Sequence, residues 1–194
     1  MNRKWEFYNV DNDKVREISE KHGISELLAT VLYNRDVLDD DEIDVFLNPK
    51  RSDFHDPYLM PDMEVAVNRI IKAIENDEKV MIYGDYDVDG ITSITVLKKF
   101  LQERGLDAGY KIPNRLNEGY GLNKNAIEKI AKEGYTLIIT VDCGISGNDE
   151  IDLANSLGME VIVTDHHEPL EELPNAYAII DCKRKDNKYP FKSL

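Results

Sequence analysis

Long apolar runs, a secretory leader and paired cysteines are all missing from this sequence. The longest apolar runs, such as 137–139, are far too short to cross a membrane. The opening residues, Met-Asn-Arg-Lys-Trp-Glu, lack the apolar core of a secretory signal. The two cysteines, Cys143 and Cys182, form no metal-ligand pair, so we expect reduced thiols in a cytoplasmic protein.

Positive charge is also scarce. There are 24 Lys and Arg residues against 38 Asp and Glu residues, which gives a net charge of −14. This balance argues against a surface that coats nucleic acid generally, although a local basic groove stays compatible with it. With 42% hydrophobic residues in 194, the chain is long enough for one large domain or a domain with a small attachment.

The first part of the chain has a helical pattern. Short helices are expected at 13–21, 24–34 and 39–47, and the acidic run in the last of these suits a helix N-terminus. Residues 48–62 contain three prolines and are expected to form a connector. We therefore expect residues 1–62 to be an N-terminal helical region with its connector.

From residue 63 onward, helical and strand patterns alternate. Apolar, β-branched segments predict strands at 79–83, 110–112, 136–141, 160–164 and 177–180. Helical spacing separates most of them, which predicts an α/β fold over 63–194: a parallel sheet flanked by helices. Ligands bind such sheets beyond the carboxyl ends of the strands, and the three strongest strands lead into Asp85, Asp142 and the run 165–167.

The most informative segment is Tyr83-Gly-Asp-Tyr-Asp-Val-Asp-Gly-Ile-Thr-Ser93. It places Asp85, Asp87 and Asp89 within five residues, and carboxylates so close together repel one another unless a cation lies among them. The helix expected to begin at Gly90 offers free N–H groups to an anion. A metal cluster beside such a helix start suggests phosphate chemistry.

Three other interpretations of this segment are weaker. A calcium-binding EF-hand loop would need Glu where Val96 stands, and a helix before the loop. A phosphatase that forms an aspartyl-phosphate needs only one metal, and would leave two adjacent histidines unexplained. A plain acidic turn remains open.

Two further segments supply candidate ligands. Asp142 follows a strand, which alone is a weak signal because such residues often cap helices. Asp165-His166-His167 is a stronger signal, because half of the four histidines are adjacent here at a predicted strand end. Oxygen and nitrogen ligands without thiolate suit manganese, with magnesium or cobalt as alternatives, better than structural zinc. Two such ions could generate a hydroxide and stabilise both the attacking and the leaving oxygen.

Taken in order, the three segments resemble the DHH phosphoesterase superfamily, which is named for its Asp-His-His motif. The form of 84–93 is similar to the RecJ branch, the single-strand-specific 5′→3′ DNA exonucleases. The segment 112–122, Ile-Pro-Asn-Arg-Leu-Asn-Glu-Gly-Tyr-Gly-Leu, and the helical leader also resemble that branch. The resemblance covers nearly the whole chain.

The resemblance implies a role for each site residue. Two divalent ions, expected to be Mn²⁺, would be held by Asp85, Asp87, Asp89, Asp142 and His166, with Asp142 bridging both. His167 would face the scissile phosphate, and Asp165 would orient a histidine. The expected phosphate contacts are Gly90, Thr92, Ser93 and Arg115.

The sequence departs from the family pattern in two places. Many DHH enzymes have a His where Tyr83 stands, so nitrogen ligation is lost there. The family also has a further Asp and a C-terminal substrate-gripping domain downstream, whereas this chain stops at Leu194. Asp181 lies too close to His167 to be identified as that Asp. We therefore expect an N-terminal fragment, incomplete at its C-terminus, that alone binds metal weakly and degrades DNA poorly.

The function implied is 5′→3′ hydrolysis of single-stranded DNA in recombination and repair, beside single-strand-binding protein and a helicase. One alternative is a relative acting on short oligonucleotides or cyclic dinucleotides. Another is a non-catalytic binding module. Tyr86, Tyr120 and Tyr135 could stack on bases, although core packing is the more ordinary role for each.

Overall fold

The computed structural model describes residues 4, 6, 8–116 and 119–191. The chain divides into two compact units, residues 1–54 and 55–194, which are described separately. The connector expected at 48–62 straddles this division.

The first unit is helical, as predicted. It contains α1 (Asn12–His22), α2 (Glu26–Tyr33), α3 (Asp40–Leu47) and a single 3₁₀ turn (Arg51–Asp53). Each α-helix begins at a polar cap, and the Asp39 carboxylate accepts the N–H of Asp41 at 3.0 Å. The apolar faces of the helices meet in a small core made of Val15, Ile18, Ala29, Leu32 and Ile43.

The second unit alternates helices and strands. After a 3₁₀ turn (Pro57–Leu59) come α4 (Met63–Glu75), β1 (Val80–Gly84), α5 (Val88–Glu103), β2 (Gly109–Lys111), α6 (Lys124–Lys132), β3 (Leu137–Val141), α7 (Asn148–Ser156), β4 (Glu160–Asp165) and β5 (Ala178–Asp181). No helix in the described part of the chain is long and apolar enough to cross a membrane.

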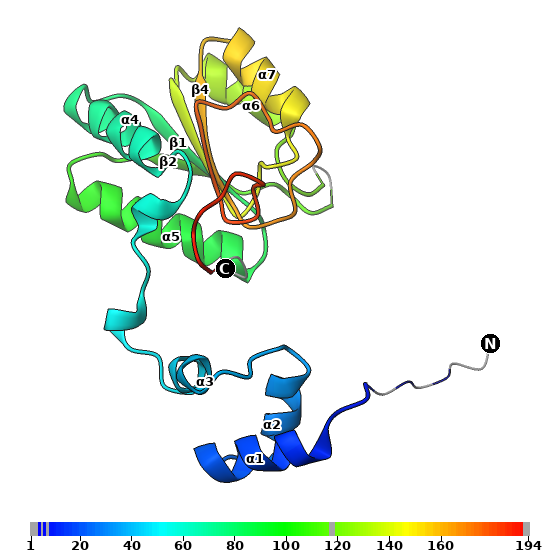
Figure 1. Cartoon of the computed structure of the whole chain (residues 1–194). Coiled ribbons are helices and arrows are strands. Elements are labelled where there is room, and N and C mark those ends of the chain that lie inside the picture. Colours follow the sequence, from blue (N-terminus) through cyan, green and yellow to red (C-terminus); the bar gives the residue numbers. More distant parts are fainter. Residues whose placement is uncertain (1–3, 5, 7, 117–118, 192–194) are drawn as a thin grey trace. The chain divides into compact units, whose positions relative to one another are not determined.

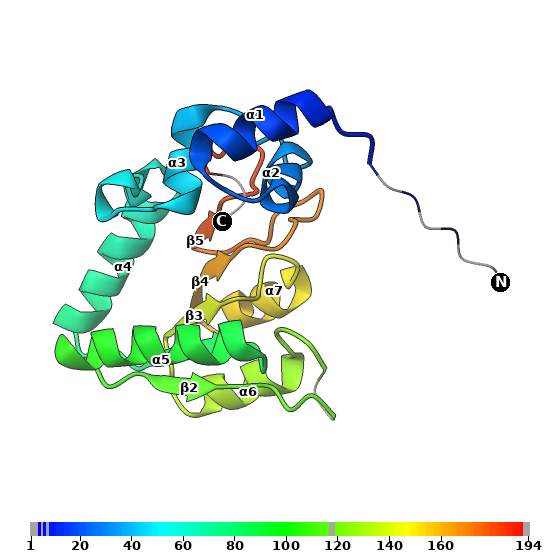
Figure 2. The same ribbon diagram turned by 90° about the horizontal axis from the view of Figure 1, so that it is seen from below.

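The five strands form one parallel sheet in the order β2-β1-β3-β4-β5. Figures 1 and 2 show its helices in two layers, with α4 and α5 over one face and α6 and α7 over the other. The predicted fold class, a parallel sheet flanked by helices, is therefore confirmed.

Burial on both faces explains the uninterrupted apolar character of the central strands. In β1, Met81 and Tyr83 pack on the α6 and α7 side, whereas Val80 and Ile82 pack on the α4 and α5 side. The same alternation runs through β3, where all five residues are buried. Charged side chains are thereby confined to the strand ends.

The outer edge of β5 is tied to the start of α4 by side chains. The Asp62 carboxylate accepts the N–H of Ile179 at 3.1 Å. Arg184 donates from Nη1 to both the Asp62 carboxylate and the Ile179 carbonyl oxygen, each at 2.6 Å. Asp186 accepts hydrogen bonds from the other two guanidinium nitrogens.

A buried ion cluster closes the opposite, amino-terminal end of the sheet. The Arg69 side chain, 4% exposed, donates to both oxygens of Glu78, at 3.2 and 2.7 Å, and to Glu160. These hydrogen bonds from Arg69 lower the pKa of Glu78. The cluster thus links α4 to Glu78, which precedes β1, and to Glu160, the first residue of β4.

Replacing Arg69 by Met is expected to lower the free energy of unfolding by about 2–3 kcal/mol, because the largely buried Glu78 carboxylate loses its partner. Lys72→Met, an exposed change on the same helix, should cost less than about 0.5 kcal/mol. Urea titrations measure both. A carboxyl whose pKa is lower in the folded chain stabilises the fold above its unfolded pKa and stops doing so as the pH falls. The difference in free energy of unfolding between wild type and Arg69→Met should therefore become smaller in acid. Equal free energies of unfolding at neutral pH would contradict the prediction.

Candidate metal centre

The candidate site lies at the carboxyl ends of the strands. The strand order reverses its direction of growth between β1 and β3, which is where parallel sheets of this order bind ligands. Asp85 follows β1, Asp142 follows β3, and β4 ends at Asp165 directly before the histidine pair. The parallel register therefore brings all three motifs to one edge.

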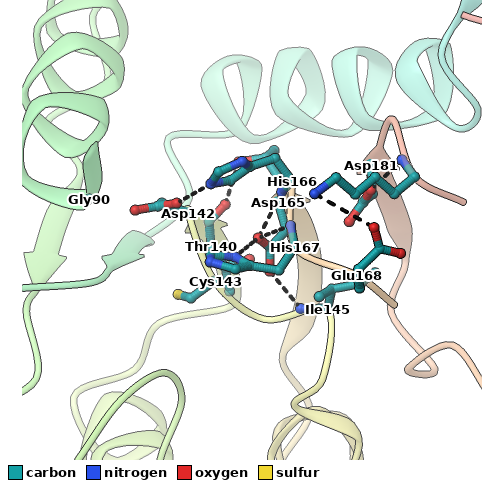
Figure 3. A network of polar contacts seen from close by, with 12 residues as sticks. Gly90, Thr140, Asp142, Cys143, Ile145, Asp165, His166, His167, Glu168 and Asp181 are labelled. Carbon is teal, nitrogen blue, oxygen red and sulfur yellow. Dashed lines mark hydrogen bonds and ion pairs between the residues drawn. The ribbon is translucent and has the colours of Figure 1, made fainter. Parts of the chain in front are cut away.

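Three predicted residues form a compact group. One donor atom from each of Asp142, His166 and His167 can be chosen so that all three lie within 4.8 Å of one another. Nε2 of His166 is 3.0 Å from Oδ1 of Asp142. Figure 3 shows the two imidazole rings side by side, with Asp142 next to His166. One carboxylate and two imidazoles at this spacing match the donors preferred by manganese or cobalt.

Asp142 is held in an unusual conformation. Its φ of +59° lies in the left-handed region, and its N–H donates to the Thr164 carbonyl at 3.0 Å, continuing the β3–β4 pairing. Its side chain is 7% exposed. Burial raises the pKa of Asp142, and the nearby Asp87 carboxylate raises it further. A cation between these acids would relieve their repulsion.

Both carboxylate oxygens of Asp165 accept hydrogen bonds from backbone groups. One carboxylate oxygen accepts the N–H groups of His166 at 2.7 Å and His167 at 3.2 Å, and contacts Nδ1 of His167 at 2.7 Å. The other accepts the N–H of Ile145 at 3.0 Å. The contact at Nδ1 fixes the His167 ring, so Asp165 is suited to orienting a histidine.

The first motif lies around the start of α5. Asp87 caps the helix by accepting the N–H of Gly90 at 3.0 Å, which is the main reason that its pKa is lowered. Gly90 is needed because a Cβ there would be 2.4 Å from the Asp85 carbonyl oxygen. Asp85 is 1% exposed, and its Oδ1 has no hydrogen-bond partner among the described residues. Such an orphaned oxygen is suited to a cation.

The three aspartates of this motif lie outside the compact group of Asp142 and the two histidines. Asp87 and Asp89 are exposed at the beginning of α5, and Asp85 is buried beneath them. The structure thus places the acidic first motif beside this group, with the Asp87 carboxylate close to Asp142.

The predicted phosphate contacts differ in their surroundings. The Gly90 N–H is occupied by Asp87, and the Thr92 hydroxyl donates to the Val88 carbonyl inside the helix. Ser93 lines a hollow of about 430 Å³ together with Asp142 and His166. Arg115 is exposed and lies over the Tyr86 ring, 5.3 Å from its centroid.

Tyr120 lies next to the site. Nothing in the sequence indicated that its hydroxyl would contact His167. Its hydroxyl is 3.2 Å from Nε2 of His167 and 3.4 Å from the Asp142 carbonyl oxygen. A second hollow, of about 300 Å³, extends from Tyr120 and His167 to the start of α7. The sequence feature that could have indicated a sharp loop here is the pair of glycines on either side of Tyr120. Both have positive φ in the structure.

Asp181 ends β5 in register with Asp165. It is fully buried, and burial raises its pKa. Its Oδ1 accepts the Lys183 N–H at 2.7 Å, whereas Oδ2 has no hydrogen-bond partner within the described residues.

Known proteins share both the motifs and the fold. The model of the DHH family, N-terminal domain, matches residues 79–190. The chain is 44% identical to the single-stranded-DNA-specific exonuclease RecJ of Bacillus subtilis, over 98% of this chain and 24% of that protein. It is 35% identical to RecJ of Haemophilus influenzae, over 93% of this chain and 31% of that protein. The chain thus spans about a quarter to a third of the length of these relatives.

Among solved structures, exonuclease RecJ bound to manganese matches with a TM-score of 0.62 and 32% identity, over 66% of this chain and 33% of that one. RecJ from Thermus thermophilus in complex with Mn²⁺ matches with a TM-score of 0.66 and 24% identity, over 91% of this chain and 24% of that one. The second likeness concerns the fold alone.

Asp165→Asn is expected to lower the free energy of unfolding by about 1–3 kcal/mol, because an amide cannot accept all the hydrogen bonds that the carboxylate accepts. Asp152→Asn, on the exposed side of α7, is the matched control and should change it little. Denaturation followed by circular dichroism measures both variants. Equal losses in the two would contradict the positioning role.

Proposed function

This chain belongs to the DHH family, and we propose that it carries the metal-binding part of a phosphoesterase that removes nucleotides from the 5′ end of single-stranded DNA. The observation that carries the proposal is the group of Asp142, His166 and His167 at the carboxyl edge of the sheet. The identity to RecJ exonucleases over nearly the whole chain supports this substrate. Because the chain spans only part of those proteins, their activity is proposed for it.

The donor set supports a divalent metal, with two Mn²⁺ ions as the proposed cofactor and Mg²⁺ or Co²⁺ as alternatives. His166 and Asp142 would hold one side of the centre, and the orphaned Oδ1 of Asp85 would help to hold the other. Asp87 and Asp89 would complete it from the start of α5, and Asp142 would bridge the ions. When bound, the ions would supply a hydroxide nucleophile and offset charge on the phosphate.

The remaining residues would place the substrate. His167 would face the scissile phosphate, since its ring is exposed and Asp165 fixes its Nδ1. Ser93 and Arg115 would approach the DNA backbone. Gly90 and Thr92 would contribute only if their present hydrogen bonds within α5 were exchanged.

The acidic chain needs the metal before it can approach DNA. A net charge of −14 repels a polyanion, and bound cations reverse that repulsion locally. A cytoplasmic role in recombination and repair, beside single-strand-binding protein and a helicase, stays a prediction that rests on the resemblance.

Replacing Asp142 by Asn should weaken Mn²⁺ binding on the order of 100-fold, because the variant loses the carboxylate charge shared by both proposed ions. Asp107→Asn, an exposed carboxylate paired with Lys98 at 2.9 Å, is the control and should bind Mn²⁺ as the wild type does. Calorimetric titration measures both. Unaltered binding in Asp142→Asn would refute the bridging role.

The proposed substrate can be separated from its alternatives by rates measured with protein in excess, so that slow cleavage is detected. We expect Mn²⁺-dependent release from a long 5′-phosphorylated single strand to exceed that from a dinucleotide or a cyclic dinucleotide. The reverse order would favour the oligonucleotide alternative. If cleavage of all three substrates were no faster than with Asp142→Asn, a binding module would be favoured.

A further inference from the structure

Tyr83 is a buried polar residue at the position where many DHH enzymes are expected to have a histidine. It lies in β1, fully buried within the apolar cluster beneath α6 and α7. A tyrosine in such surroundings requires partners for its hydroxyl, whereas phenylalanine would fill the same space without them. The use of the hydroxyl therefore needs an explanation.

The Tyr83 hydroxyl binds the segment that precedes α6. It donates to the Gly121 carbonyl oxygen at 3.1 Å and accepts from Nδ2 of Asn123 at 3.1 Å. Asn123 also caps α6, since its Oδ1 accepts the N–H of Ala126 at 2.8 Å. One hydroxyl thus joins β1 to the segment that directly follows Tyr120.

That loop presents Tyr120 to the site. Gly119 and Gly121 have φ values of +78° and +75°, so the backbone turns on both sides of the tyrosine. Gly121 is buried, and its carbonyl is the group that Tyr83 holds. Tyr120 itself is 51% exposed, so packing alone does not fix its position.

Tyr120 lies against the His167 ring. Its hydroxyl is 3.2 Å from Nε2 and 3.4 Å from Nδ1, and the two rings meet edge to face with centroids 5.8 Å apart. Asp165 contacts Nδ1 at 2.7 Å. The imidazole is therefore held by a buried carboxylate at Nδ1 and by the hydroxyl of a loop residue that lies against the ring.

We propose that Tyr83 is a positioning residue for His167, acting through the Gly121 carbonyl and Asn123 to hold the Tyr120 hydroxyl against the imidazole. Its catalytic meaning rests on the proposed function, in which His167 faces the phosphate. The positioning of the His167 ring by Tyr83 is independent of the proposed function, because the ring can be observed without any substrate.

The test compares Tyr83→Phe with Tyr135→Phe. Both changes remove one hydroxyl, and both tyrosines pack against the same cluster, but Tyr135 precedes β3 at the end of the sheet opposite the site. The chain has only four histidines, so a long-range proton–nitrogen NMR spectrum of isotope-labelled histidine resolves their rings, and His167→Gln assigns the signal of interest.

We expect Tyr83→Phe to shift or broaden the His167 ring signals, Tyr120→Phe to do the same, and Tyr135→Phe to leave them in place. A purely structural role for Tyr83 would lower stability and leave those signals unmoved, which would overturn the proposal. So would an effect of Tyr120→Phe that Tyr83→Phe does not reproduce.

Activity gives a second and separate readout. With protein in excess over single-stranded DNA, Tyr83→Phe should lower the cleavage rate on the order of 10-fold, as expected for a displaced catalytic group, and Tyr135→Phe should leave it unchanged. If the wild type neither binds Mn²⁺ nor cleaves DNA, the proposed function fails. The NMR comparison still decides whether Tyr83 positions His167.

Discussion

Burial of the sheet on both faces is the constraint on which the rest of this unit depends. Because α4 and α5 cover one face and α6 and α7 the other, the central strands have no room for charged side chains along their length. The charged residues are displaced to the strand ends, and the parallel register collects the carboxyl ends at one edge. Motifs that are far apart in the sequence thereby become neighbours, and the 3.0 Å contact between Asp142 and His166 joins two of them.

The cost of this arrangement is a concentration of negative charge. Six carboxylates follow or end β1, β3, β4 and β5, namely Asp85, Asp87, Asp89, Asp142, Asp165 and Asp181. The fold neutralises them unequally: Asp165 and Asp87 accept N–H groups, whereas Asp85 and Asp181 each keep a buried oxygen without a partner among the described residues. Burial raises the pKa of Asp142, whereas the hydrogen bond from the Gly90 N–H lowers the pKa of Asp87, so the two acids of this edge differ because of their immediate surroundings.

The sequence predicted those parts of the fold that depend on local pattern. The strand at 136–141 was readable because a buried parallel strand is β-branched and uninterrupted, and the observed β3 differs by one residue at its start. The edge on which Asp142 and the histidines meet followed from the same parallel arrangement. The hydrogen bonds within α5 that compete with phosphate binding could not be predicted from the sequence. Whether Asp87 caps Gly90 or leaves it to an anion, and whether the Thr92 hydroxyl turns back to its own helix, depends on rotamers that spacing does not encode.

The loop carrying Tyr120 shows the same limit, since its path depends on two backbone torsions rather than on an apolar pattern. The hydrogen bonds that join Asp62 and Arg184 to β5 have a consequence for the edge of the sheet. An outermost strand normally exposes N–H and C=O groups that can recruit a strand from another molecule. Here both backbone groups of Ile179, in the middle of that strand, are already bonded to side chains. The sheet is thereby protected against edge-to-edge aggregation on this side by a buried arginine, without a proline or a bulge.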